Sequence, residues 1–319
     1  MTIFQAIQLN DLNLIKDYLV DINEVDEKKK SLLFHAVISG SFETVKFLIE
    51  LGASINLADK YGETPLFDCA RKAKINLGKI LIQHGAKVNI ANNFGEYPIH
   101  LASKKGNEEF IKLLLESGAN INVSTEKDYL PAHYAVQSGN IPVLEMLIEK
   151  SGINYFTHDT DRNTFLHHAC KNTSLEMIEF LLKKGLDANT LNSELETPLF
   201  NACRYSSREV ILCLLDSGAL LEVKNKRFET ILETTVEKRR YDIKELLETY
   251  KDSSKYQEYE NGNQLTICVL NRDYNALKQF IGLKKSVGYT KAGKTALDYA
   301  KENHLAAYAN LLKELDTNI

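Results

Sequence analysis

Between Gly62 and Asn122, dense apolar runs at helical spacing alternate with short polar segments. The same pattern occurs twice within this stretch. Each copy carries a proline near its start, at Pro65 and at Pro98, and a glycine near its end, at Gly85 and at Gly118. The two prolines are separated by the same interval as the two glycines. A fixed period of about 33 residues is typical of stacked structural repeats.

Each copy predicts two helices. Thr64 can cap the first helix through its hydroxyl, and Pro65 suits the first helical turn, where no backbone N–H is required. The run from Phe110 to Leu115 is too apolar for a solvated helix and predicts a buried second helix. The asparagines four residues after the closing glycines, Asn89 and Asn122, suit a tight turn.

The period extends over most of the chain. The proline slot is filled by Pro65, Pro98, Pro131 and Pro198. The closing glycines recur at the same interval, apart from a single inserted residue before the fourth, and they are Gly52, Gly85, Gly118, Gly152, Gly185 and Gly218. Because each repeat packs mainly on its neighbours, a chain of 319 residues then needs no division into two globular domains.

The segments that open these copies resemble the signature of ankyrin repeats. They read Thr64-Pro65-Leu66, Pro98-Ile99-His100-Leu101-Ala102, Pro131-Ala132-His133-Tyr134-Ala135, Thr164-Phe165-Leu166-His167-His168-Ala169 and Thr197-Pro198-Leu199-Phe200-Asn201-Ala202. The resemblance is clearest over residues 31–235 and covers about ten units. It implies an all-α solenoid of helix–turn–helix units with hairpin-like loops, in which the signature histidine bonds to neighbouring backbone.

We expect one ankyrin-repeat array over residues 1–319. Its predicted parts are an N-terminal cap (1–29), regular repeats (30–248), an irregular loop (249–263), and atypical C-terminal repeats with a cap (264–319). The polar, tyrosine-rich segment 249–263 could instead be a break between two stacks. The step from Thr230 to Gln264 is close to the repeat period, which favours the loop.

Composition bears on the compartment. No stretch reaches the roughly 20 apolar residues of a membrane span, and the first residues show no secretory signal. The five cysteines form no CxxC pair, and an odd number suits free thiols in a reducing compartment. We therefore expect a cytoplasmic protein. That cytoplasm is the one of the producing cell, or of a host cell if the protein is a pathogen's effector. Frequent Lys, Asn and Ile suggest an AT-rich genome, which is compatible with a pathogen.

Catalytic motifs are missing from the sequence: it has no glycine-rich phosphate loop, no HExxH and no GxSxG. The cluster most like a metal site is His158, Asp159, Asp161, His167, His168 and Cys170. His167 and His168 are adjacent on a helix and point about 100° apart, which opposes joint chelation. We expect no cofactor, no metal and no enzymatic activity.

The resemblance implies that a partner protein contacts the loop tips and the ends of the first helices. The helix-end positions are Arg71, Lys72, Lys104, Lys105, Lys171, Arg204 and Tyr205. The loop-tip positions are Lys60, Tyr61, Asn93, Phe94, Lys127, Tyr129, Lys226, Arg227 and Phe228. We call the six cations of the first set the helix-end row.

Because the helix-end row is basic, we expect an acidic partner segment, with Tyr61 and Phe94 holding its apolar residues. The protein is then a non-enzymatic adaptor, scaffold or inhibitor. Two alternatives stay open: an enzyme with its site on residues 249–263, and a nucleic-acid binder along the basic row. A net charge of −4 does not favour nucleic acid. The oligomeric state is open, with a monomer expected.

Overall fold

The computed structural model describes residues 2–172, 174–282 and 290–316. In these residues the secondary structure is helical apart from isolated bridges in three loops. The chain forms two compact units, residues 1–153 and residues 154–319. None of the helices in the described ranges has the length and apolar character that a membrane crossing requires.

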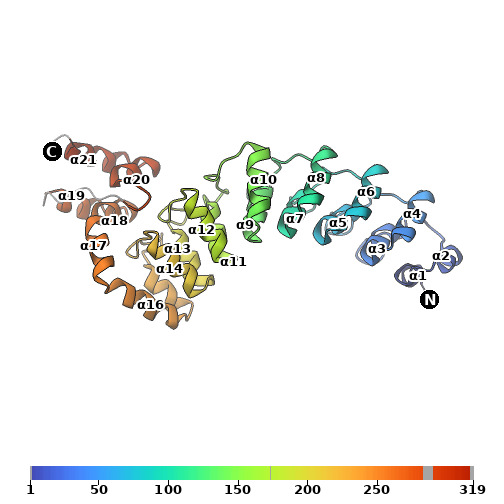
Figure 1. The fold of residues 1–319 in the computed structure, drawn as a ribbon, viewed down its shortest axis with the longest axis horizontal. Coiled ribbons are helices and arrows are strands. Elements are labelled where there is room, and N and C mark those ends of the chain that lie inside the picture. The colour runs from blue at the N-terminus through green and yellow to red at the C-terminus, as the bar shows by residue number, and fades with distance from the viewer. Residues whose placement is uncertain (1, 173, 283–289, 317–319) are drawn as a thin grey trace. The chain divides into compact units, whose positions relative to one another are not determined.

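The helices come in antiparallel pairs joined by short turns (Figure 1). The first unit contains α1 (Ile3–Leu9), α2 (Leu12–Tyr18), α3 (Leu32–Ser39), α4 (Phe42–Glu50), α5 (Pro65–Lys72), α6 (Ile75–Gln83), α7 (Pro98–Lys105), α8 (Glu108–Glu116), α9 (Pro131–Gln137) and α10 (Ile141–Ser151). The second unit contains α11 (Phe165–Asn172), α12 (Leu175–Lys183), α13 (Pro198–Tyr205), α14 (Arg208–Asp216), α15 (Ile231–Glu237), α16 (Tyr241–Lys251), α17 (Ser254–Gly262), α18 (Gln264–Leu270), α19 (Tyr274–Gly282), α20 (Ala296–Glu302) and α21 (Ala306–Asp316).

Side-chain caps begin many of the second helices. In α8 the Asn107 side chain accepts a hydrogen bond from the N–H of Phe110 at 2.7 Å. The expected hydroxyl cap of Thr64 on α5 was wrong, since the Thr64 side chain makes no cap bond there. The carbonyl of Thr64 instead accepts from the N–H of Phe67 at 3.0 Å, so a backbone turn satisfies that donor.

The core lies between the helix layers. First helices pack on first helices (α5 on α7, α7 on α9, α11 on α13), and second helices pack on second helices (α4 on α6, α6 on α8, α12 on α14). Phe110 and Leu114 of α8 are fully buried. Gly78 of α6 leaves room for Phe110, because a Cβ at residue 78 would lie 2.6 Å from the Phe110 ring. An alanine would therefore have to displace a packed aromatic ring.

Asparagines after the closing glycines join neighbouring repeats. The Asn56 amide donates to the Gly85 carbonyl at 2.9 Å, and its oxygen accepts from the Lys87 N–H at 2.8 Å. Asn89 makes the same two bonds to Gly118 and Asn120. Their backbone lies outside the left-handed region, so the interpretation as turn residues was incomplete. We call these residues the asparagine ladder.

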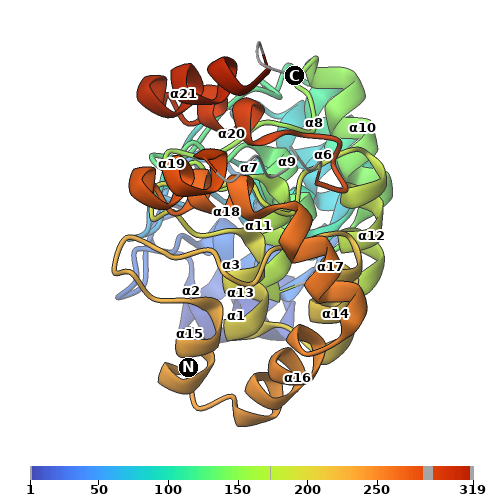
Figure 2. The same ribbon diagram turned by 90° about the vertical axis from the view of Figure 1, so that its left-hand side faces the viewer.

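Residues 249–263 differ from the expected irregular loop. Helix α16 continues to Lys251, and α17 follows after a cap by Ser253. Tyr256 of α17 is buried, and its hydroxyl accepts from the N–H of Leu221 at 2.8 Å. Packing of this tyrosine on the preceding repeats explains why a polar sequence is helical here. Figure 2 shows α17 leading from α16 to α18.

The C-terminal helices cover loops of earlier repeats in the second unit. α18 packs on α20, and α19 packs on α21. The hydroxyl of Tyr299 in α20 donates to Asp187 at 2.7 Å, and that of Tyr259 in α17 donates to the Gly218 carbonyl at 2.9 Å. This cover buries Leu220, whose equivalent in an earlier repeat is the exposed Lys87.

Candidate partner-binding surface

The loop tips of the first unit are held rigidly. The Asp59 carboxylate accepts from the N–H groups of Tyr61 and Glu63 at 2.8 and 3.0 Å. Asn92 plays the same part for Phe94 in the next tip, at 2.9 Å. Adjacent tips are also linked directly, because the Asn93 N–H donates to the Tyr61 carbonyl at 2.9 Å. The tips thus present their side chains on an ordered backbone.

Two aromatic side chains project from these tips. Tyr61 is 43% exposed and Phe94 is 62% exposed. The Lys60 ammonium lies 5.0 Å from the centroid of the Tyr61 ring, which places a cation beside an aromatic face. Tyr129 differs from both, since it is half-buried and stacks on His133 with ring centroids 5.7 Å apart. Among the three predicted aromatic residues at the loop tips of the first unit, Tyr61 and Phe94 are therefore the ones that a partner can reach.

The helix-end row of the first unit is only partly available. Arg71 pairs with Glu63, and Lys72 pairs with Asp68 at 3.5 Å. Lys104 and Lys105 at the end of α7 are exposed, and neither makes an ion pair within the described residues. Free positive charge in the row of this unit is therefore concentrated at the end of α7.

The pairing follows a spacing of eight residues that the sequence interpretation missed. A glutamate just before the first helix reaches the cation at its end, as in Glu63–Arg71 and Glu196–Arg204. Glu96 and Lys104 have the same spacing, but Glu96 accepts from the Tyr134 hydroxyl at 2.8 Å. Lys104 is left without that partner.

A further cationic tip was also missed. The Lys60 N–H donates to the Lys28 carbonyl at 2.9 Å, so the loop of Lys28 and Lys29 joins the same row of tips. Both lysine side chains are exposed. Lys28 lies one repeat period before Tyr61, so counting back from that tip would have found it.

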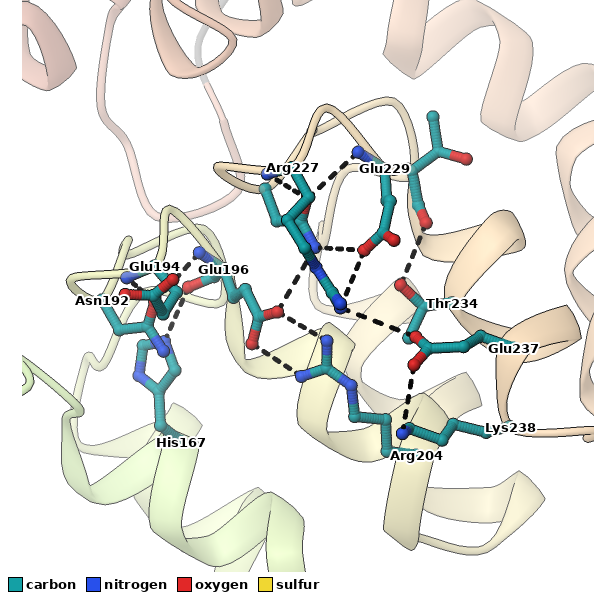
Figure 3. Close-up of polar contacts among 12 residues, drawn as sticks. His167, Asn192, Glu194, Glu196, Arg204, Arg227, Glu229, Thr234, Glu237 and Lys238 are labelled. Atoms are coloured by element: carbon teal, nitrogen blue, oxygen red, sulfur yellow. Dashed lines mark hydrogen bonds and ion pairs between the residues drawn. The ribbon is translucent and has the colours of Figure 1, made fainter.

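In the second unit Arg204, Arg227 and Lys226 pair with acidic side chains of the same unit, and Figure 3 shows the pairs of Arg204 and Arg227. The Arg204 side chain is 10% exposed and makes two bonds to Glu196, at 2.5 and 2.6 Å; these bonds raise the pKa of the guanidinium. Arg227 lies 2.9 Å from Glu229 and 3.6 Å from Glu237. Lys226 pairs with Glu194 at 3.4 Å.

The remaining predicted residues fall in two groups. Lys171 at the end of α11 is half-buried, whereas Lys127, Tyr205 and Phe228 are exposed. Three cations of the helix-end row have acidic partners: Arg71 pairs with Glu63, Arg204 pairs with Glu196, and Lys72 shares Asp68 with Lys74, which lies closer, at 2.9 Å. For the two arginines the reason is that the slot eight residues before the helix end carries a glutamate.

The signature histidines tie repeats together, as expected. In His100, Nδ1 accepts from the Tyr97 N–H at 3.0 Å and Nε2 bonds to the Tyr129 carbonyl at 2.9 Å. His167 makes equivalent bonds to Thr164 and to the Glu196 carbonyl. Burial lowers the pKa of each imidazole to about 4. Both rings are therefore neutral at pH 7.

Side chains of the candidate metal cluster form buried hydrogen bonds with one another and with neighbouring residues. His168 Nε2 lies 3.0 Å from an Asp159 oxygen, and both side chains are buried. Burial alone would raise the pKa of Asp159, but hydrogen bonds from His168 and Asn163 outweigh it and lower the pKa to about 2. Within the described ranges no three such side chains are grouped to hold a metal ion. Burial also raises the pKa of the Cys203 thiol to about 12, which disfavours a thiolate nucleophile.

Comparison with known proteins identifies the family. A family model described as ankyrin repeats (3 copies) matches residues 3–92, 75–159 and 152–225. The chain belongs to the ankyrin repeat family. Such repeats are generally protein–protein interaction modules, and their fold is typically non-enzymatic.

A solved structure supports the same assignment. The chain is similar to the crystal structure of the human ASB11 ankyrin repeat domain, at 27% sequence identity and a TM-score of 0.56. The similarity covers 71% of this chain and 95% of that chain. No curated protein sequence matches the chain significantly.

Proposed function

We propose that this protein is a non-enzymatic module that binds an acidic segment of a partner protein through its first unit. One observation carries the proposal: Lys104 and Lys105 are exposed and have no ion-pair partner among the described residues, in a repeat whose tip presents the exposed Phe94. Unpaired cations attract an acidic surface, and exposed aromatic side chains are frequent binding anchors. The equivalent Arg71 and Arg204 are already neutralised, so a partner gains less from them.

The cellular compartment in which the protein acts is also part of the proposal. We place the module in a cytoplasm, and the Lys-, Asn- and Ile-rich composition is compatible with a pathogen's effector acting inside a host cell. No particular side chains support the two alternatives, an enzyme with its site on residues 249–263 and a nucleic-acid binder along the basic row. Most of residues 249–263 lie in α16 and α17, where Tyr256 is buried. The pairing of Arg71 and Arg204 weakens a basic track for nucleic acid.

Charge reversal at α7 tests the proposal. We expect Lys104→Glu combined with Lys105→Glu to weaken partner binding by at least about tenfold, mainly by slowing association, with the melting temperature near wild type. The measurement is surface plasmon resonance at several salt concentrations, with the partner that co-purifies with the full chain. For the wild type, association should slow as salt rises.

The matched control is Lys79→Glu combined with Lys112→Glu. These lysines are on the second helices α6 and α8, and the change of charge is the same. Their pairs, with Glu109 at 3.7 Å and Glu108 at 3.5 Å, are exposed and contribute little stability. Unchanged affinity in the Lys104/Lys105 variant, or an equal loss in the control, would place the contact surface elsewhere.

A further inference from the structure

The second unit contains a cavity of about 360 Å³ beside the loops of two neighbouring repeats. Phe156 and Arg162 line it from the loop before α11, and Leu186 and Leu191 line it from the loop after α12. Lys294 and Glu302 of the α20 repeat close another side. The volume falls in the range of small-molecule sites, and the lining combines apolar walls with a few charged groups.

The cavity opens where the asparagine ladder is interrupted. Phe156 occupies the slot that other repeats fill with Asn56, Asn89, Asn122 and Asn189. The ladder asparagine would bridge to the Gly185 carbonyl, as Asn56 does to Gly85, and Gly185 lines the cavity. Phe156 has no amide to make this bridge, and 60% of the residue is exposed.

A second departure from the repeat pattern lies beside the first. Leu186 follows its closing glycine, where four other repeats carry alanine: Ala53, Ala86, Ala119 and Ala219. Leu186 and Leu191 together form an apolar wall of the cavity. Local violations of a structural pattern that gather around one cavity indicate a role other than folding.

One charged side chain of the cavity lining differs from the others in its partners. Lys294 lies 3.2 Å from Asp187 and 2.8 Å from Glu302, and Asp187 also accepts from the Tyr299 hydroxyl, so both carboxylates have partners and share one ammonium. The Arg162 guanidinium has no hydrogen-bond or ion-pair partner in the described part of the chain. Arg162 also has a φ of 59°, in a loop-tip slot where Gly62, Gly95, Asp128, Leu195 and Phe228 have positive φ as well. This strained backbone holds an unpaired cation at the cavity.

We propose that this cavity binds a small aromatic anion, with the ring against Phe156, Leu186 and Leu191 and the anionic group at Arg162. Stacking and apolar contact hold the ring, and the guanidinium bonds to carboxylate, sulfonate or phosphate oxygens. This site lies within the second unit and is independent of the partner-binding surface proposed for the first.

The test uses 8-anilinonaphthalene-1-sulfonate, a fluorescent aromatic sulfonate, with the full chain. Saturable binding of one molecule per chain is expected. Phe156→Asn, which restores a ladder residue, and Arg162→Asn, which keeps a residue that tolerates positive φ, should each weaken binding by at least about tenfold. Neither should lower the melting temperature, so lost binding with retained stability separates a ligand site from a structural role.

The matched controls share the same backbone or exposure. Arg239→Asn removes an exposed arginine at a φ of 56°, and Phe228→Asn removes an exposed phenylalanine at a φ of 62°. Both should bind the probe like wild type. The proposal is overturned if wild-type protein shows no saturable binding, or if Phe156→Asn and Arg162→Asn retain affinity within about twofold of wild type.

Discussion

Leu114→Ala is expected to lower the free energy of unfolding by about 2–5 kcal/mol, the usual cost of truncating a buried leucine. Leu114 is fully buried in α8, which packs on both α6 and α7. The loss combines the transfer free energy of the removed atoms with a cavity that the packed helix layers fill only partly. Urea denaturation followed by circular dichroism measures the change.

Leu51→Ala provides the control for this prediction. Leu51 is an exposed leucine at the end of α4, so its truncation should change stability by no more than about 0.5 kcal/mol. Because repeats support their neighbours, hydrogen exchange in Leu114→Ala should rise most in the repeats around α8. A loss below about 0.5 kcal/mol would show that Leu114 is not a core residue.

Acidification between pH 7.5 and 5 is expected to destabilise the protein through His100 and His167. Burial holds the pKa of each near 4 in the folded protein, against 6.5 as the ordinary value. The unfolded chain therefore binds protons first, and stability falls as pH falls. The contribution of the two neutral histidines to stability is complete above pH 6.5 and is lost as the pH falls towards 4. At pH 5 the loss is about 2 kcal/mol for each histidine.

Variants separate these histidines from the carboxylates. His100→Gln and His167→Gln should each be less stable than wild type at pH 7.5, because a bridge between repeats is lost, and should show a shallower fall in stability towards pH 5. Asp159, with a pKa of about 2, loses its contribution only at lower pH, outside this range. If the stability of wild type and of both variants depended on pH in the same way, His100 and His167 would not be buried, neutral groups.

The repeat period was sufficient to predict the helical fold, because prolines and glycines mark helix starts and ends by local backbone chemistry. The role of Asn56 and Asn89 was not predictable from local chemistry. Their amides reach the next repeat, whereas the same residues also suit a turn within one repeat. The helix α17 was hidden for a similar reason, because Tyr256 is buried by residues far away in sequence.

The candidate surface was predictable in position but not in charge. The sequence locates Arg71, Lys104 and Arg204 in one slot of successive repeats. Which of them is free depends on long-range competition for glutamates. Glu63 and Glu196 bind their arginines, whereas the hydroxyl of Tyr134, which lies in the next repeat, occupies Glu96. A count of cations cannot reveal that competition.

Zero-length carbodiimide cross-linking of the full chain with its co-purified partner tests the partner-binding surface most directly. The reagent joins lysine amines to carboxylates that are already in contact, and mass spectrometry identifies the joined peptides. We predict cross-links from Lys104 and Lys105 of α7 to aspartate or glutamate residues of the partner. Cross-links confined to Lys79 of α6 and Lys112 of α8, with none at Lys104 or Lys105, would contradict the proposed surface.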